Sequence, residues 1–380
     1  MSQTLVSPRY LALDSSHLAQ WVRDRTSTTP TERRAAKSFE RWLEDNGWIP
    51  LLCLHHLAEL ANHQTIEIAR TRLHFIGDLK LMAWVGTANA EQGLGTVVSL
   101  LTEEVRAALA FPSADIVEIR DRARPKILQV GAGVDAIGPE PDLWLEMRPV
   151  FAAQAEKARA LAAFTRGKLI DLSAMKMGEL LNGGIRRGPE LARRLELIAG
   201  SYAIDIALRG DDAIEDPAGV ADEFMRQAFN MAHPLPATAR DLALRLLALQ
   251  GLTAADIDPD RTLGETLDLG VFRTQLRIVA ENLNCAPDAL SSSVRMEQIP
   301  SRTITRALER HPPAVRRHYG SEITDGHLAC LCAYADATLV DKRTLESFRR
   351  ARPHEPDLSR LARRFMRAPT YRDIASLLAL

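Results

Sequence analysis

SEITDGHLACLCAYADATLVDKRTLESF, residues 321–348, is the stretch on which the interpretation of this chain depends. Its pattern predicts a short apolar helix over 323–334, a tight connection and a buried strand over 337–340. Asp325 then lies in the first turn of the helix, and Asp341 follows the strand directly. Ligands of α/β sheets bind at the carboxyl ends of strands. Two carboxylates that meet there favour a bound cation or a shared proton.

The composition is that of an ordinary globular protein. The 380 residues are 46% hydrophobic and 26% charged, which is enough for a large core, and the length suggests about two domains. The net charge is −1, but residues 301–380 hold 15 Lys and Arg against 9 Asp and Glu. A basic segment beside an acidic remainder is typical of proteins with an anionic partner, although arginine-rich helix faces are often only solvated.

Cysteine spacing and hydropathy bear on the compartment. The 4 cysteines are scattered and predict no disulfide framework. Cys330 and Cys332 with His327 do not give the four-ligand spacing of a zinc site. The chain does not begin with an apolar leader, and no uncharged apolar run approaches the ~20 residues that a membrane span needs. We therefore expect a cytoplasmic protein with buried thiols and no membrane partner.

The N-terminal part alternates between predicted strands and helices. Buried strands are expected at 10–13, 48–54 and 81–85, with helices between them at 30–46, from His55 onward and at 65–79. This order indicates a parallel sheet with right-handed crossovers. Asp14 ends the first strand, and Glu59 lies one turn into the helix that follows the second.

From Gly86 the pattern becomes mainly amphipathic helix. The clearest helices are expected at 96–109, 150–163, 189–207, 221–231 and 239–249, and the best strand candidate is 115–119. GGIRRG at 183–188 has the glycines of a phosphate loop but no strand beside it, which favours an interhelical connection. After the opening stretch, 357–367 and 371–380 predict two more helices.

Four acidic residues occupy related places in these elements. They are Asp14, Glu59, Asp325 and Asp341. Each alone is most simply explained as a helix cap, a turn former or a solvated side chain. Together they are more informative, because all four fall where a parallel sheet gathers the ends of its strands.

These residues resemble the motifs of the PIN domain family of metal-dependent ribonucleases. The resemblance is carried by LALDSS at 11–16, LHHLAEL at 54–60 and DGHLACLCAYADATLVDKRT at 325–344, of which the last is the most specific. It implies an acidic quartet that is catalytic and binds the metal, a further metal-binding acid from the Tyr-x-Asp motif, and an auxiliary hydroxyl. The matching residues are, in that order, Asp14, Glu59, Asp325 and Asp341; Asp336; and Ser16.

The resemblance also implies an architecture. We expect an α/β fold in which a PIN-like parallel sheet flanked by helices is built from both chain ends, 1–90 and 318–355. A compact member has little between its second and third acids, whereas 265 residues separate Glu59 from Asp325 here. We interpret 91–317 as a mainly α-helical inserted domain and 356–380 as a C-terminal helical extension.

The chemistry expected of such a site follows from its oxygen ligands, which favour Mg²⁺ or Mn²⁺. Such ions activate a water and stabilise a leaving oxygen, so we expect hydrolysis of RNA phosphodiester bonds. His55, His56 and His63 are expected to be surface or capping residues. Haloacid-dehalogenase phosphatases also begin with an Asp at a strand end, but they need a second Asp two residues later, where this chain has Ser16.

Basic residues near the last acid are expected to contact RNA, which we take as the partner. They are Lys342 and Arg343, and a set at helical spacing: Arg360, Arg363, Arg364 and Arg367. A solvated or acid-paired helix face explains the second set equally well. The alternative function is a non-catalytic PIN-fold scaffold, or a partner-regulated toxin, whose helical insertion binds protein. The presence of all four acids favours the enzyme.

Overall fold

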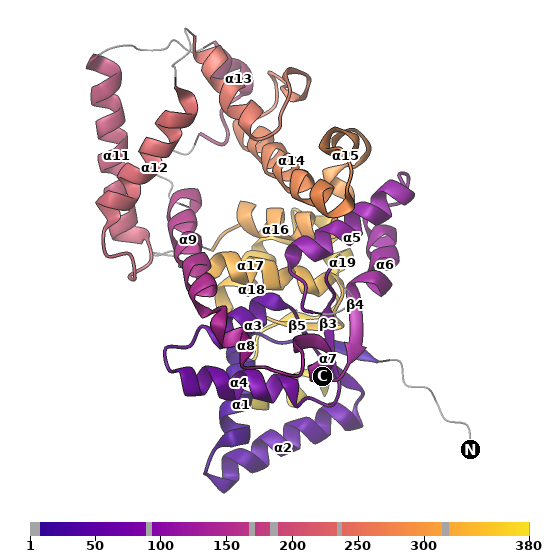
Figure 1. The fold of residues 1–380 in the computed structure, drawn as a ribbon. Coiled ribbons are helices and arrows are strands. Elements are labelled where there is room, and N and C mark those ends of the chain that lie inside the picture. Colours follow the sequence, from indigo (N-terminus) through magenta and orange to yellow (C-terminus); the bar gives the residue numbers. More distant parts are fainter. Residues whose placement is uncertain are drawn as a thin grey trace.

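The computed structural model describes residues 8–88, 93–166, 172–182, 189–233, 238–313 and 319–379 (Figure 1). The glycine-rich stretch at 183–188 lies outside them. The predicted α/β class is confirmed, with helices predominating around one sheet. No helix in the described ranges is long and apolar enough to cross a membrane.

One mixed sheet of six strands runs through the described residues, in the order β4-β3-β2-β1-β5-β6. The strands are β1 Arg9–Ala12, β2 Trp48–Leu52, β3 Met82–Val85, β4 Leu128–Gly131, β5 Ala337–Leu339 and β6 Phe365–Met366. Neighbours are parallel except β4, which runs antiparallel to β3. The two ends of the chain therefore supply five of these strands. β4 comes from the region for which helices were expected, and it makes the sheet mixed rather than purely parallel.

The strand order reverses beside β1, which is the central strand from which the fold grows. The chain first moves outward through β2 and β3, and it returns much later to place β5 on the other side of β1. Leu11 pairs with Ala337 and Ala12 with Thr338. Such a reversal creates a crevice at the carboxyl ends of the two strands, and ligands of α/β sheets bind there.

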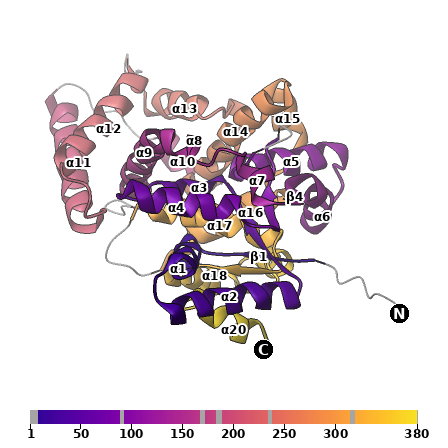
Figure 2. The ribbon, with the colours of Figure 1, turned by 60° about the horizontal axis from the view of Figure 1, so that its bottom comes forward.

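Four helices from the N-terminal part cover one face of the sheet (Figures 1 and 2). They are α1 Ser15–Thr26, α2 Pro30–Asp45, α3 Leu54–Ala61 and α4 Ile66–Gly77. Their apolar faces meet Leu11 and Leu13 of the β1 region, and fully buried Trp21 packs edge-on against Phe39 and Phe75 at about 5 Å. Side chains alternate along a strand, so Ala12 faces the opposite core.

The other face is covered by helices from the middle and the end of the chain. They include α5 Val97–Ala110, α6 Ile116–Ile127, α16 Pro300–Arg310, α18 Lys342–Ala351 and α19 Pro356–Leu361. Right-handed crossovers that run in opposite directions across a sheet must lie on opposite faces, which explains the two layers. The strand expected at 115–119 is wrong: Asp115 accepts hydrogen bonds from the amides of Val117 and Glu118 and caps α6 instead.

The expected boundaries at 90 and 317 do not coincide with a break in this core. α5, α6 and α16 come from the segment interpreted as an insertion, yet they share one hydrophobic cluster with Leu51 and Ala83 of the sheet. A fully buried carboxylate also joins them: Glu104 of α5 accepts hydrogen bonds from the Ser301 amide and from the Tyr334 hydroxyl at 2.6 Å. The sheet and these helices therefore share one hydrophobic core.

Only part of the middle segment has cores of its own. Met177, Leu181 and Leu247 centre one small cluster, and Ile206 and Ala221 form another. α11 and α12 lie at one side of the molecule, away from α1 and α2 (Figures 1 and 2). The remaining helices are α7 Gly133–Ile137, α8 Leu143–Glu146, α9 Arg148–Arg166, α10 Met177–Leu181, α11 Pro189–Arg209, α12 Pro217–Ala232, α13 Ala239–Leu249, α14 Leu263–Leu283, α15 Pro287–Ser293 and α17 Ser321–Ala329, with the 3₁₀ turns η1 Ala254–Asp256, η2 Met296–Gln298 and η3 Cys330–Ala333.

The segment after 356 corrects another expectation. A helix over 357–367 is wrong beyond Leu361, because the chain leaves α19 there and adds β6 to the edge of the sheet. η4 Tyr371–Asp373 and α20 Ile374–Ala379 follow and pack on the α1–α2 layer.

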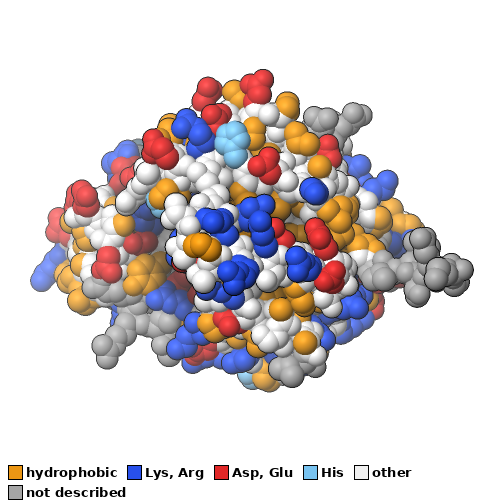
Figure 3. Space-filling view, turned by 90° about the horizontal axis from the view of Figure 1, so that it is seen from below, with side chains coloured by type: hydrophobic (Ala, Val, Ile, Leu, Met, Phe, Trp, Pro, Cys, Tyr) orange, Lys and Arg blue, Asp and Glu red, His pale blue; other side chains and the backbone are white. Residues whose placement is uncertain are grey.

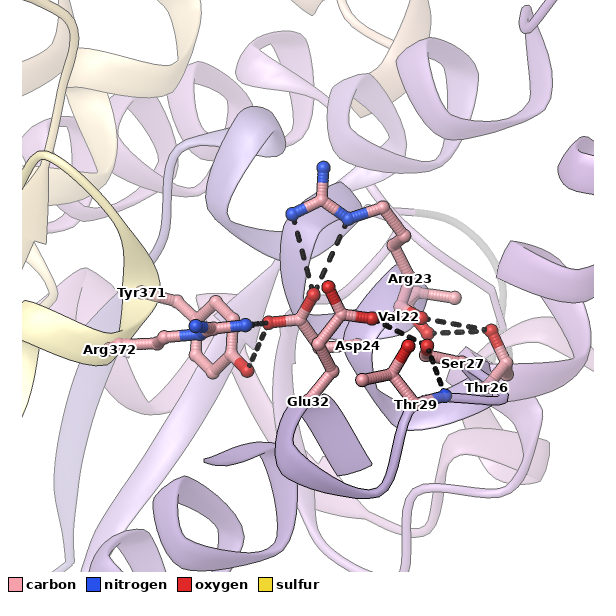
Figure 4. Close-up of polar contacts among 9 residues, drawn as sticks. All are labelled: Val22, Arg23, Asp24, Thr26, Ser27, Thr29, Glu32, Tyr371 and Arg372. Carbon is pink, nitrogen blue, oxygen red and sulfur yellow. Dashed lines mark hydrogen bonds and ion pairs between the residues drawn. The ribbon is translucent and has the colours of Figure 1, made fainter. Parts of the chain in front are cut away.

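A buried ion pair fastens this segment to α1, as Figure 4 shows. The carboxylate of Asp24, which is 0% exposed, accepts hydrogen bonds from the Tyr371 hydroxyl at 2.7 Å and from Arg372 Nε at 2.9 Å. Arg23 approaches the other oxygen at 3.4 Å. Burial opposes the charged form, but these donors outweigh it and hold the pKa of Asp24 below its usual range.

Candidate functional site

The predicted acids at the ends of β1 and β5 lie at the reversal of strand order. Asp14 is the residue before α1, and its Oδ1 accepts a hydrogen bond from the Ser16 amide at 2.8 Å. Asp341 is the residue before α18 and accepts hydrogen bonds from the amides of Arg343 and Thr344. Because β1 and β5 are hydrogen-bonded neighbours, these two capping carboxylates stand at the same edge.

The other two predicted acids reach this edge on helices. Glu59 is on α3, which follows β2, and Asp325 is on α17, which packs against both α3 and α18. Burial raises the pKa of Asp325 to about 8, together with the negative charges of Asp341, Glu59, Asp14 and Glu322, in that order. The other three predicted carboxylates therefore all act on Asp325.

The pKa of Glu59 is also raised by burial and by a neighbouring carboxylate. Burial raises its pKa, the nearby Ser15 hydroxyl partly offsets this, and the charge of Asp14 adds to it. The hydroxyl beside Glu59 thus belongs to Ser15, whereas Ser16 contributes its amide to Asp14 and is itself exposed. A helix start turns consecutive side chains by about 100°, and the sequence motif alone did not indicate which serine turns inward.

The carboxylates interact electrostatically, but their side chains are not arranged as a set of metal ligands. Within the described ranges, no group of three or more His, Cys, Asp or Glu side chains is placed to hold a metal ion. Capping and mutual repulsion both explain this, since Asp14 and Asp341 turn toward helix amides. A carboxylate oxygen has a second lone pair, so a capping Asp retains the capacity to bind a cation. The donor set, oxygen only, fits Mg²⁺ or Mn²⁺.

Sequence reasoning missed a fifth carboxylate, Glu322, which is one turn before Asp325 on α17 and adds to its raised pKa. Its Oε1 accepts a hydrogen bond from Arg343 at 3.1 Å, and that guanidinium also lies over the Tyr319 ring at 4.5 Å. Arg343 is thus engaged within the protein. The i, i+3 spacing of Glu322 and Asp325 was the available signal.

Asp336 lies at the other end of the sheet, which corrects its expected place among the metal ligands. It precedes β5, whereas Asp341 follows it. Its Oδ2 accepts a hydrogen bond from the Tyr10 amide at 2.9 Å, and its Oδ1 pairs with Arg363. Asp336 therefore fastens β5 to β1 at the amino edge.

The expected arginine face also does not form, because α19 ends at Leu361. Arg360 pairs with Asp115 and Asp357, and Arg364 donates to the Leu378 carbonyl at 2.8 Å. Most of this positive charge is therefore used to hold the fold together. Arg367 is exposed directly after β6, and Lys342 is exposed beside Asp341, so these two remain at the carboxyl edge.

Of the three histidines considered in the sequence, His56 joins two elements of the fold. His56 is buried; its Nε2 lies 2.8 Å from the Leu13 carbonyl and its Nδ1 accepts from the Cys53 amide, which joins β1 to α3. Burial lowers its pKa to about 4. His55 lies 4.9 Å from the His327 ring, and burial together with that neighbour lowers its pKa to about 3. His63 Nδ1 accepts a hydrogen bond from the Thr65 amide.

Comparison of the chain with protein-family models, with curated proteins and with solved structures finds no match. The assignment of a function therefore depends on the geometry and charge of this site.

Proposed function

We propose that this chain is a metal-dependent ribonuclease of PIN-like fold whose catalytic centre is formed by Asp14, Glu59, Asp325 and Asp341. The observation that carries the proposal is their convergence at the reversal of strand order, from four different elements, with the other three charges acting on Asp325. A carboxylate that only caps a helix does not require other carboxylates beside it. A partly buried group of carboxylates that raise one another's pKa is what a divalent cation relieves.

The four carboxylates would hold Mg²⁺ or Mn²⁺, which when bound supplies an activated water and neutralises charge on the phosphodiester. In this site Asp325 holds a proton at neutral pH, because its pKa lies near 8. Cation binding requires the carboxylate form and releases that proton. Asp14 and Asp341 keep their helix amides as positioning contacts. Arg367 and Lys342 are exposed at the same edge, and their positive charges would attract the RNA backbone.

The first test compares RNA cleavage by the full chain with that of Asp14→Asn, Glu59→Gln, Asp325→Asn and Asp341→Asn in Mn²⁺. Removing a group that acts with the others should cost at least about a hundredfold in rate. The matched control is Asp45→Asn, an exposed acid at the end of α2, which should leave the rate unchanged. Cleavage that survives all four substitutions would overturn the proposal.

Proton release provides a readout that is independent of cleavage. Titrating Mn²⁺ at pH 7 into the wild type should release close to one proton per bound ion, measured by calorimetry in buffers of different ionisation enthalpy. Asp325→Asn should release far less, because its amide carries no titrating proton. Equal proton release from both proteins would contradict the assignment of Asp325.

A second candidate, a protein-binding scaffold, has one observation in its favour. Leu197, Ile204 and Leu208 of α11 are 63%, 60% and 65% exposed, and their spacing puts them on one side of that helix. A scaffold needs no metal, so the two tests above separate the candidates. Absent Mn²⁺ binding and absent cleavage would favour the scaffold.

A further inference from the structure

A cavity of about 330 Å³ lies between α1 and α4, away from the four carboxylates. Its polar walls come from Gln20 and Arg23 of α1, from His63, and from Thr71 and Arg72 of α4. The volume is that of a site for a small group. Figure 3 views the molecule from below and shows several Lys and Arg side chains near the middle of that face, with Asp and Glu side chains among them.

Arg72 is the unusual member of this cavity. Its Nε is buried without a hydrogen-bond partner, as are those of Arg273, Arg302 and Arg306. The last three each pair with an acid. Within the described part of the chain, no ion pair compensates Arg72, and burial lowers its pKa. A buried Nε–H group without a partner is costly, and an anion that enters from the cavity can accept its hydrogen bond.

The neighbouring groups suit an anion. His63 Nδ1 accepts from the Thr65 amide, which leaves Nε2 to donate toward a ligand. Arg23 has a side chain that is 69% exposed, and its contact with Asp24 is long, at 3.4 Å. A guanidinium binds phosphate through two parallel hydrogen bonds, which favours a phosphate group over a simple halide.

We propose that the pocket between α1 and α4 binds a phosphate group through Arg72, and that in the proposed ribonuclease this phosphate belongs to the substrate strand. The second half rests on the proposed function. Gln20 is six residues beyond Asp14 along α1, about 9 Å at the rise of an α-helix.

The test uses the full chain in EDTA, so that RNA is bound but not cleaved. Arg72→Met should bind a single-stranded RNA oligonucleotide about tenfold more weakly. The slope of log affinity against log salt should fall by about 0.7, the value for one lost phosphate contact. Arg70→Met is the matched control, because Arg70 lies on the same helix but is exposed and pairs with Asp142. It should change neither quantity.

A second arm uses inorganic phosphate alone and checks the fold. Phosphate should raise the melting temperature of wild type and of Arg70→Met but not of Arg72→Met. Without phosphate, Arg72→Met should melt at or above the wild-type temperature, because a buried Nε–H group without a hydrogen-bond partner is gone. An arginine that only supports structure predicts a lower melting temperature instead.

The outcomes separate the two proposals. If Arg72→Met matches Arg70→Met in both arms, the phosphate pocket is overturned. A different result is that Arg72→Met loses the stabilisation by inorganic phosphate while it binds RNA as the wild type does. That result would keep the pocket, assign it to a free phosphorylated compound and overturn the contact with the RNA strand. If Arg72→Met loses phosphate binding while the four acid variants cleave as wild type does, the pocket stands and the ribonuclease fails.

Discussion

The side chain of Asp325 makes no hydrogen bond or ion pair with the described residues, yet four other carboxylates act on its charge. A side chain held in this way is destabilising when no cation is present. Its folded-state pKa, about 8, lies above the model value of 3.8. Folding therefore favours the protonated form, so the stability linked to Asp325 is complete below pH 4 and is lost as the pH rises through 8.

In EDTA, Asp325→Asn should be more stable than wild type at pH 8, by about 2 kcal/mol, a value reduced for the partial solvent access of the site. The two proteins should converge near pH 4. Saturating Mn²⁺ should reverse the order at pH 8, since the wild type gains about 2.7 kcal/mol at a hundredfold excess over Kd. Urea unfolding at both pH values measures this.

The exposed Asp45→Asn variant should follow the wild type under all these conditions. If Asp325→Asn is less stable at pH 8 and Mn²⁺ shifts neither protein, Asp325 is structural and the charge argument fails.

The sequence indicated the four carboxylates because each follows a buried strand or lies on a helix packed at the strand ends. The predicted strand at 337–340 already put Asp336 and Asp341 at opposite ends of that strand, and it was the resemblance to the PIN family that wrongly grouped Asp336 with the metal ligands. The sequence could not show that Arg343 is occupied by Glu322. Such pairings are set by side-chain direction, which local pattern does not reveal.

Glu104 shows how single contacts join elements that are distant in the chain. Burial raises its pKa to about 7 from 4.5, although hydrogen bonds from Ser301 and Tyr334 oppose the rise. Because the folded-state pKa is raised, the stability linked to this group is present below pH 4.5 and is lost as the pH passes 7. Ionisation of this buried carboxyl therefore lowers the stability of the fold as the pH rises.

Glu104→Gln should remove this pH dependence. The free energy of unfolding of the variant minus that of the wild type should increase from pH 5 to pH 8, by about 3 kcal/mol at most, because only the wild type loses stability over this range. Both hydroxyls can rotate to accept from the new amide, so the fold should persist. Glu118→Gln, a surface change on α6, is the control and should show the wild-type profile. A constant difference across the pH range would mean that Glu104 stays charged in the folded protein.

Long amphipathic helices and buried strands were the elements that the sequence indicated best, with α13 expected and found at 239–249. The short strands were missed for a physical reason. β4 has Val130 46% exposed and no alternation, and β6 has only two residues. Both exist because a neighbouring strand offers hydrogen bonds, which is a non-local cause.

At the scale of the whole molecule, stability is unevenly distributed. One continuous core links the sheet to α5, α6 and α16, whereas the described parts of α10–α13 bury only small clusters. Few buried apolar contacts allow local opening at low free energy. The division of the chain into domains could not be predicted from composition, because helices that pack on the sheet and helices that do not have the same amphipathic pattern.

Hydrogen exchange followed by mass spectrometry should therefore separate two classes of amides. Those of β1, β2 and β5 should exchange only through global unfolding, and those of α11–α13 should exchange orders of magnitude faster, with little sensitivity to Mn²⁺. The amides of α5 serve as the internal control and should exchange with the sheet. Equal protection of α5 and α12 would contradict this division of the core.

The ion pair between Asp24 and Arg372 has a consequence for synthesis of the protein. The two residues are 348 positions apart, so a ribosome adding about 5–20 residues per second needs roughly 20–70 s to make the second after the first. During that interval Asp24 has only the long contact with Arg23 and lacks Tyr371 and Arg372, and β1 has no β5 beside it. The growing chain therefore emerges with an incomplete sheet that is open along one side, and the free edge of β1 can pair with another strand until β5 has been made.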